Sequence, residues 1–124
     1  LVENPSLVLQ DGVYYLMYSG NWFEGGNYAL GFAVCEGPRG PCHKPLDKPF
    51  FAITSNDVGG EVGPGGGSFF RDHAGNLWIA YHAWRSPSIG FSAGGQRRLS
   101  IARVEFENGI PTVLRPETIM SPGP

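Results

Sequence analysis

The chain has no long hydrophobic run, few charged residues and almost no helical periodicity. None of its apolar runs approaches the roughly 18 residues that span a bilayer, so no membrane partner is expected. Charged residues make up 16% of the 124 residues and aromatic residues 13%, whereas a disordered tail shows the opposite balance. With 9 Lys and Arg against 11 Asp and Glu, the chain also lacks the basic surface that binds nucleic acid. These absences favour one modest folded domain.

Helical patterns are missing because a Gly or Pro interrupts every window with the apolar spacing of a helix. Short aromatic and β-branched runs, bounded by turn residues, predict strands instead. The predicted strands are residues 6–9, 13–19, 28–34, 68–71, 77–84, 99–107 and 111–114. Asp11-Gly12 and Asn108-Gly109 each separate two of these runs, and such pairs favour tight hairpins. The sequence therefore predicts an all-β fold.

The first predicted hairpin resembles a later one. Residues 6–18 match residues 68–81, with an offset of 62 that rises to 63 after one inserted residue in the turn. Units of about 40–50 residues with four short antiparallel strands are typical of β-propeller blades. We therefore predict two blade-like units, about 3–60 and 64–120, with a chance likeness of two hairpins as the alternative. Two blades cannot close a ring, and the chain begins at Leu1, so we expect a portion of a larger protein.

Cysteine is scarce, and both cysteines, Cys35 and Cys42, flank a segment rich in turn formers. A disulfide that closes this short loop is the favoured interpretation, and it would indicate an oxidising, secreted setting. Two unrelated buried thiols and a metal-binding pair are the alternatives. The adjacent His43 does not complete a zinc site, since a structural zinc ion has four protein ligands and these residues are three.

Several motifs follow one another in an informative order. Glu3-Asn4-Pro5 precedes the aromatic strand 13–19, and the glycine-rich segment 63–67 precedes the strand 77–84 and the hairpin 97–111. Together they resemble the glycoside hydrolases of family 43 over nearly the whole chain. The resemblance implies the C-terminal part of a five-bladed β-propeller. It also implies hydrolysis, with inversion, of arabinosyl or xylosyl linkages in plant polysaccharides such as arabinan and arabinoxylan.

The resemblance places the catalytic general acid at Glu3, near the start of an innermost strand. The family's base Asp and a second, assisting Asp lie upstream of this segment by family order. Inverting hydrolysis needs two carboxyl groups about 6.5–9.5 Å apart with a water between them, so these residues alone are expected to be inactive. Asp11 and Asp72 fall in predicted turns, and Asp47 and Asp57 in loops, which makes none of them a candidate base.

Five further residues are candidate sugar ligands. Trp22, next to Asn21 in a predicted loop, could stack on a sugar ring or pack in the core. Arg97 matches a family arginine near the sugar pocket, where a guanidinium can grip a hydroxyl. Gly66 stands where many family members have a His that helps to bind a central metal ion or water. His82 is expected either to line a wall or to hydrogen-bond to substrate or to the acid.

No cofactor and no metal ligand are expected within this chain. The segment 63–67 lacks the Lys-Ser/Thr ending of a phosphate-binding loop. The resemblance leaves room for a central calcium ion in the full-length protein, although Gly66 departs from the usual ligand. A carbohydrate-binding propeller without catalysis, and a structural all-β domain without a sugar site, are the alternative functions.

Overall fold

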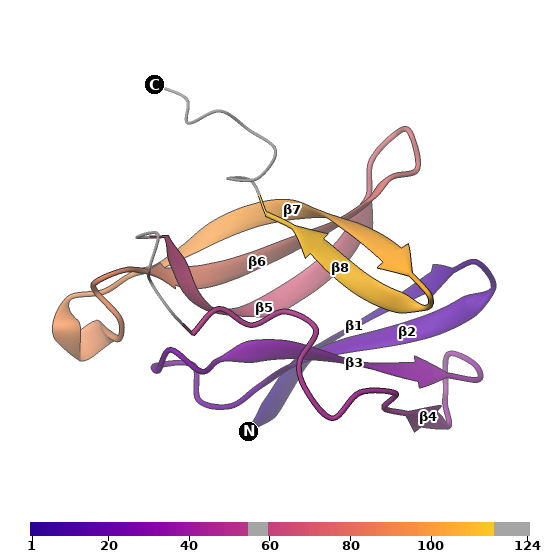
Figure 1. Cartoon of the computed structure of the whole chain (residues 1–124), viewed down its shortest axis with the longest axis horizontal. Coiled ribbons are helices and arrows are strands. Elements are labelled where there is room, and N and C mark those ends of the chain that lie inside the picture. Colours follow the sequence, from indigo (N-terminus) through magenta and orange to yellow (C-terminus); the bar gives the residue numbers. More distant parts are fainter. Residues whose placement is uncertain (55–59, 116–124) are drawn as a thin grey trace.

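The computed structural model describes residues 1–54 and 60–115, which form two four-stranded antiparallel sheets. In each sheet the strands lie in sequence order (Figure 1). The first sheet contains β1 (Val2–Gln10), β2 (Val13–Gly20), β3 (Ala29–Cys35) and β4 (Cys42–His43). The second contains β5 (Glu61–Arg71), β6 (Leu77–Arg85), β7 (Arg97–Glu107) and β8 (Ile110–Leu114), with the short 3-10 helix η1 (Phe91–Ala93) before β7. The predicted all-β fold with two blade-like sheets is confirmed.

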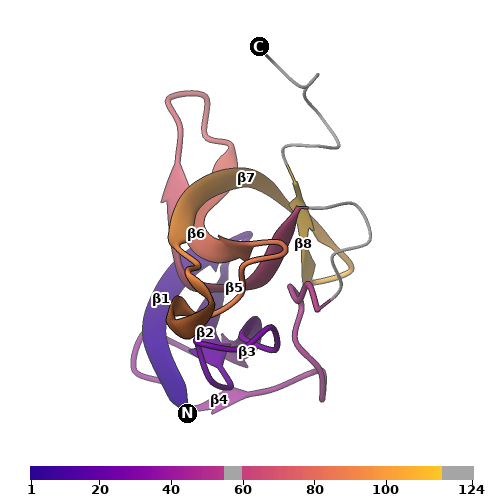
Figure 2. The ribbon, with the colours of Figure 1, turned by 90° about the vertical axis from the view of Figure 1, so that its left-hand side faces the viewer.

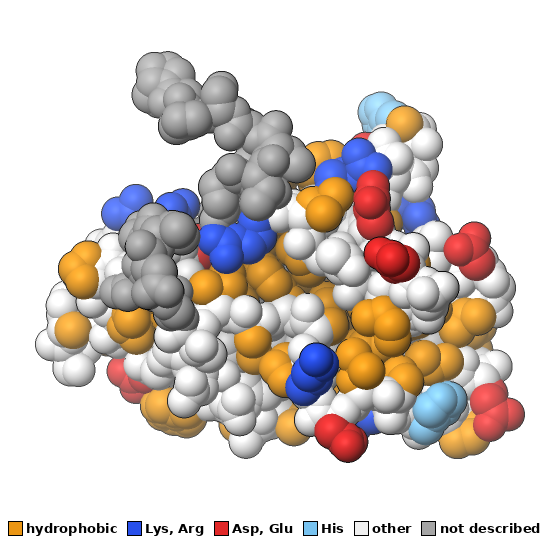
Figure 3. Space-filling view, viewed as in Figure 1, with side chains coloured by type: hydrophobic (Ala, Val, Ile, Leu, Met, Phe, Trp, Pro, Cys, Tyr) orange, Lys and Arg blue, Asp and Glu red, His pale blue; other side chains and the backbone are white. Residues whose placement is uncertain are grey.

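The two sheets stack face to face and enclose one hydrophobic core (Figures 1 and 2). Side chains from both sheets fill it, among them Met17 and Leu30 from the first and Ile79 and Tyr81 from the second. Residues of β1 and β7 that the strand register turns away from this core are exposed instead, namely Leu7, Leu9, Leu99 and Ile101. Hydrophobic side chains also reach the surface over both sheets in Figure 3. Among residues 1–54 and 60–115, no helix is long and apolar enough to cross a membrane.

Both predicted hairpin turns are present. Asp11 and Gly12 have φ angles of 51° and 79° between β1 and β2, and Asn108 and Gly109 have φ angles of 53° and 77° between β7 and β8. Such turns suit the right-handed twist of the strands, and only Gly, Asn and Asp adopt this region readily. The local sequence therefore sets the register of these two hairpins.

The second sheet begins earlier than the sequence predicted. Residues 68–71 were expected as a strand, whereas β5 starts at Glu61 and includes the glycine-rich segment 63–67. The pairing of β5 with β6 shifts twice in this segment, and Gly63 and Gly66 adopt positive φ angles. The prediction was wrong because glycine is depleted in regular strands but common at bulges.

Side chains of β1 and β2 hydrogen-bond to the backbone of β5, which lies over these two strands (Figures 1 and 2). The hydroxyl of Ser6 accepts a hydrogen bond from the backbone N–H of Phe69 at 3.0 Å, and that of Ser19 accepts one from Gly66 at 2.8 Å. Ser19 is fully buried. Because these bonds involve the β5 backbone, they place Gly66 beside the end of β2.

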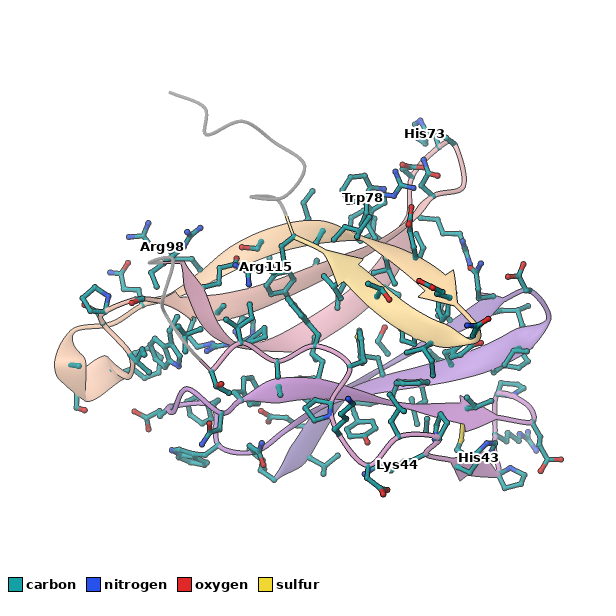
Figure 4. The ribbon with its side chains drawn as sticks, in the orientation of Figure 1. His43, Lys44, His73, Trp78, Arg98 and Arg115 are labelled. Carbon is teal, nitrogen blue, oxygen red and sulfur yellow. A yellow bond between two sulfur atoms is a disulfide. The ribbon has the colours of Figure 1, made fainter. Side chains whose placement is uncertain are left out.

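Cys35 and Cys42 form a disulfide, seen as a yellow bond beside His43 in Figure 4. The bond joins β3 to β4, where the two cysteines are paired across the strands with their Cα atoms 4.0 Å apart. The favoured interpretation of the two cysteines is confirmed. Asp57, and the end of the second unit beyond residue 115, lie outside the described residues, so the unit boundaries stay a prediction.

Candidate active site

A bulge in β1 sets the direction of Glu3. The pairing of β1 with β2 shifts between Glu3 and Ser6, and Asn4 has a φ angle of 57°. Bulges of this kind re-aim side chains and are frequent beside active sites. Glu3 itself is half-buried and pairs with Ser19 of β2. The residue is therefore built into the sheet although it lies near the beginning of the chain.

A buried tyrosine holds the carboxylate of Glu3. The hydroxyl of Tyr28 donates a hydrogen bond to Glu3 Oε2 at 2.6 Å and accepts one from Asn4 Nδ2 at 3.3 Å. Tyr28 is only 1% exposed. Burial raises the pKa of Tyr28, and the hydrogen bond to Glu3 raises it further, so the hydroxyl keeps its proton at neutral pH. Tyr28 was predicted only as the first residue of a strand, because no local pattern marks its contact with Glu3.

Tyr28 is positioned by a glycine of β5. A Cβ atom added to Gly65 would lie 1.9 Å from Cε2 and 2.2 Å from Cδ2 of the Tyr28 ring. The ring therefore lies directly against the backbone of the second sheet. This contact links the two sheets at the point where Glu3 is held.

Arg97 and His82 form the other half of the site. Arg97 Nε donates to His82 Nδ1 at 2.6 Å, and Arg97 Nη2 donates to the backbone oxygens of Gly63 at 2.9 Å and of His82 at 2.6 Å. The guanidinium carbon lies 5.1 Å from the ring centroids of both Tyr28 and Trp84. Arg97 thus joins β5, β6 and β7 to the tyrosine that holds Glu3.

The charges of this cluster follow from burial and proximity. Burial lowers the pKa of Arg97 to about 10, so the guanidinium stays charged at neutral pH. Burial also lowers the pKa of His82, and the neighbouring charge of Arg97 lowers it further, whereas the carboxylate of Glu3 acts in the opposite direction. His82 is therefore neutral at pH 7.

The low pKa of His82 predicts a pH dependence of stability. Below the ordinary value of 6.5 the unfolded chain binds a proton at this residue more readily than the folded one, so stability falls as pH decreases. The free energy of unfolding, measured with urea at pH 7.5 and at pH 5.5, should differ less between the two pH values for His82→Gln than for the parent. His73, exposed at a hairpin tip (Figure 4), is the control. If His73→Gln reduced the pH dependence of the free energy of unfolding as much as His82→Gln, the pH dependence could not be assigned to His82.

The structure places Gly66 against His82. A Cβ atom at position 66 would lie 2.1 Å from His82 Nε2, and the φ angle of Gly66 is 64°. Of the candidate ligands, Gly66, His82 and Arg97 therefore come together, with Glu3 joined to them through Tyr28. Arg98, by contrast, is exposed on β7 (Figure 4).

Asn21 and Trp22 lie apart from this cluster, in the loop between β2 and β3. The side chain of Asn21 donates to the backbone oxygen of Asn27 at 2.8 Å and so closes the loop. Trp22 is 58% exposed, with its ring centroid 4.7 Å from that of Phe23. Trp22 is therefore not part of the core, and one face of a large aromatic side chain is available to a ligand.

Aromatic side chains join that loop to the segment before β7. Phe91 of η1 is 54% exposed and lies 4.8 Å from the ring of Trp84 and 6.5 Å from that of Phe23. Trp84 Nε1 donates to the backbone oxygen of Phe23 at 2.8 Å. The two loops consequently form one rim at the same end of the molecule (Figure 1). The sequence offered no signal for Phe91, because the segment has no regular strand pattern.

A second carboxylate is buried near the start of β5. Glu61 is 5% exposed and accepts hydrogen bonds from the hydroxyls of Tyr81 and Ser100. Two hydroxyl donors satisfy a carboxylate that would otherwise be costly to bury. No local sequence pattern marks Glu61, since its partners lie 20 and 39 residues away.

The described residues do not by themselves form a cation site. Nowhere in residues 1–54 and 60–115 do three or more His, Cys, Asp or Glu side chains gather as metal ligands would. His82 lies against Gly66, and Glu3 pairs with Ser19, whose hydroxyl accepts a hydrogen bond from the backbone N–H of Gly66. A central calcium ion would need ligands beyond these described residues, so the expectation about calcium stays a prediction.

The chain belongs to glycoside hydrolase family 43. The family model described as glycosyl hydrolases family 43 matches residues 1–111. No curated protein matches the sequence. The family resemblance of the motifs is thereby confirmed.

Solved structures show the same fold. A thermostable family-43 glycoside hydrolase is 34% identical, with a TM-score of 0.80 over 99% of this chain and 38% of that one. An endo-1,4-beta-xylanase from Bacteroides thetaiotaomicron is 30% identical, with a TM-score of 0.75 over 92% of this chain and 38% of that one. An exo-1,5-alpha-L-arabinanase from a bovine ruminal metagenomic library has a TM-score of 0.67 at 19% identity, over the same shares of the two chains. The chain thus spans less than two-fifths of these relatives.

Proposed function

We propose that these residues are the C-terminal part of an inverting glycoside hydrolase that cleaves arabinosyl or xylosyl linkages in plant polysaccharides. Glu3 is its general acid. The observation that carries this proposal is the hydrogen bond of 2.6 Å by which the buried Tyr28 holds the Glu3 carboxylate, in a chain that belongs to family 43. A glutamate fixed in this way is pre-positioned for proton transfer.

This geometry supports the chemistry that we assign to Glu3. The protonated carboxyl group donates its proton to the glycosidic oxygen as the bond between that oxygen and the anomeric carbon breaks. A water molecule, deprotonated by an Asp from outside this chain, attacks the opposite face of the sugar, which inverts the configuration. Glu3 is left as a carboxylate that accepts the hydrogen bond from Tyr28, so the new negative charge is stabilised as it forms.

The outer faces of the two sheets support the larger ring. Leu7 and Leu9 on the first sheet, and Leu99 and Ile101 on the second, are between 42% and 76% exposed. Propeller blades bury such faces against neighbouring blades. We assign units of about 3–60 and 64–120 to two blades of a five-bladed propeller, and the other blades supply the base. The disulfide supports a secreted enzyme.

The proposal is tested with the longer protein on arabinan and on xylan. We expect hydrolysis of at least one polymer, a product whose first-formed anomer is inverted by NMR, and no hydrolysis by residues 1–124 alone. Turnover by residues 1–124 would contradict the missing base. Lack of turnover by the longer protein on both polymers, with binding retained, would support the non-catalytic carbohydrate-binding alternative, which the exposed Trp22 also fits.

Removal of the Trp22 ring is expected to weaken sugar binding. Loss of one stacking contact should lower the affinity of the longer protein for xylo- or arabino-oligosaccharides about 2- to 10-fold, since such contacts contribute roughly 0.5–1.5 kcal/mol. Calorimetric titration of Trp22→Ala measures this. Trp78→Phe is the matched control, because Trp78 lies by the hairpin at the other end of the sheets (Figure 4). Equal affinities of Trp22→Ala and the parent would exclude Trp22 as a ligand.

A further inference from the structure

Two of the three guanidinium nitrogen atoms of Arg97 are already engaged in hydrogen bonds. Its Nε donates to His82 Nδ1, and its Nη2 donates to the backbone oxygens of Gly63 and His82. Its Nη1 is buried and has no hydrogen-bond partner among the described residues. The guanidinium carbon also lies 5.1 Å from the ring centroids of both Tyr28 and Trp84. With Nε and Nη2 engaged and Nη1 buried, Arg97 offers no accessible free N–H group to a sugar in this arrangement.

The bond from Arg97 determines where His82 carries its proton. An N–H of arginine can only donate to a nitrogen lone pair, so His82 Nδ1 is unprotonated. A neutral imidazole with a bare Nδ1 has its hydrogen on Nε2. A second proton is disfavoured because the ring would then face the fixed charge of Arg97 with a charge of its own. His82 is therefore held as an Nε2–H donor.

The Nε2–H group lies at the point where the two sheets meet. It occupies the space that a side chain at position 66 would fill, 2.1 Å from the position of an added Cβ atom. Nε2 has no hydrogen-bond partner among the described residues, and it is not one of their buried unpartnered atoms, so solvent or a ligand can reach it. Glu3 is joined to the same place through Tyr28, whose ring lies against Gly65, the cross-strand partner of His82. A free donor thus lies near the residue that holds the proposed acid.

We infer that Arg97 is a positioning residue that holds His82 in the Nε2–H form, and that this group donates a hydrogen bond to a hydroxyl oxygen of the sugar bound beside Glu3. The sugar contact rests on the proposed function, whereas the tautomer does not. The same arrangement excludes two other roles for Nε2. Because the atom carries a hydrogen, it offers no lone pair to a cation and cannot accept the proton of a water molecule.

The tautomer is tested by NMR of the longer enzyme labelled with 15N at histidine. The signal of His82 is identified as the one that is missing from the spectrum of His82→Gln. At pH 7 we expect an unprotonated Nδ1 and a protonated Nε2, and in Arg97→Gln we expect a mixture of tautomers. A ring protonated on Nδ1, or a parent spectrum unchanged by Arg97→Gln, would overturn the positioning role of Arg97.

The sugar contact is tested in the longer enzyme with aryl pentosides that lack one hydroxyl group each. With the parent enzyme, we expect one deoxy compound to have a kcat/KM about 2- to 10-fold lower than that of the complete pentoside, the range for one hydrogen bond. With His82→Phe, the deoxy compound and the complete pentoside should have the same kcat/KM. His82→Gln, whose amide N–H can reach the same place, should restore part of the effect. Arg97→Lys should weaken the same discrimination, because an ammonium group cannot reproduce the forked contacts.

The outcomes separate the two proposals. If pentosides are cleaved but no deoxy compound shows coupling to His82, the sugar contact is wrong and the hydrolase assignment stands. If the parent cleaves no pentoside and the NMR result is as expected, the proposed function and the sugar contact both fail, and only the tautomer assignment survives.

Discussion

Replacing Glu3 with Gln should lower kcat of the longer enzyme on its polymer by about 10²- to 10⁴-fold, the usual contribution of a general acid. Glutamine keeps the size of the side chain and can still accept the hydrogen bond from Tyr28, so the local structure should be preserved. It has no acidic proton to give to the leaving oxygen. KM should change much less than kcat, because the missing interaction belongs to the transition state. Steady-state kinetics of Glu3→Gln measures both quantities.

The matched control is Glu36→Gln. Glu36 is an exposed glutamate in the disulfide-closed loop between β3 and β4, so the same chemical change there should leave kcat within about twofold of the parent. A Glu3→Gln enzyme as active as the Glu36→Gln enzyme would show that Glu3 does not donate the proton.

Replacing Gly65 with Ala should destabilise the protein by about 1–3 kcal/mol, the usual cost of an added group in a packed site. The new Cβ atom would lie 1.9 Å from Cε2 of Tyr28, a distance at which the ring must move. Because the same ring carries the hydroxyl that holds Glu3, the displacement should also lower kcat. Chemical denaturation and kinetics of Gly65→Ala, made in the longer enzyme, report the two effects together.

Gly37→Ala is the control for this substitution. A Cβ atom at position 37 meets nothing within 4 Å, and the residue does not have a positive φ angle. Its free energy of unfolding should stay within about 0.5 kcal/mol of the parent. Equal stabilities of Gly65→Ala and Gly37→Ala would mean that Tyr28 is not packed against β5 as described.

Local chemistry explains which parts of the fold the sequence could predict. The turns at Asp11-Gly12 and Asn108-Gly109 require positive φ angles, which only a few residues adopt, so the hairpins were recognisable. The pairing of Cys35 with Cys42 followed from a short loop rich in turn formers. The start of β5 was missed because bulges in its glycine-rich segment are stabilised by the other sheet, through Ser19 and Gly66.

For the candidate site, the sequence could predict some of the residues but not the contacts between them. Glu3, His82 and Arg97 could be named because they belong to motifs of the family, but their contacts depend on residues distant in sequence. Tyr28 contacts Glu3 from 25 residues away, and Arg97 contacts His82 from 15 residues away. No local pattern marks such pairs, since they meet only after both sheets have folded and stacked.

The most direct test of the central claim is the dependence of cleavage on the leaving group. A general acid matters most when the departing oxygen is basic, so Glu3→Gln should hydrolyse a pentoside of 2,4-dinitrophenol at close to the parent rate. The same variant should lose about 10²- to 10⁴-fold on the pentoside of a strongly basic alcohol or on the polymer itself. An equal loss on both kinds of substrate would contradict the assignment of Glu3 as the proton donor.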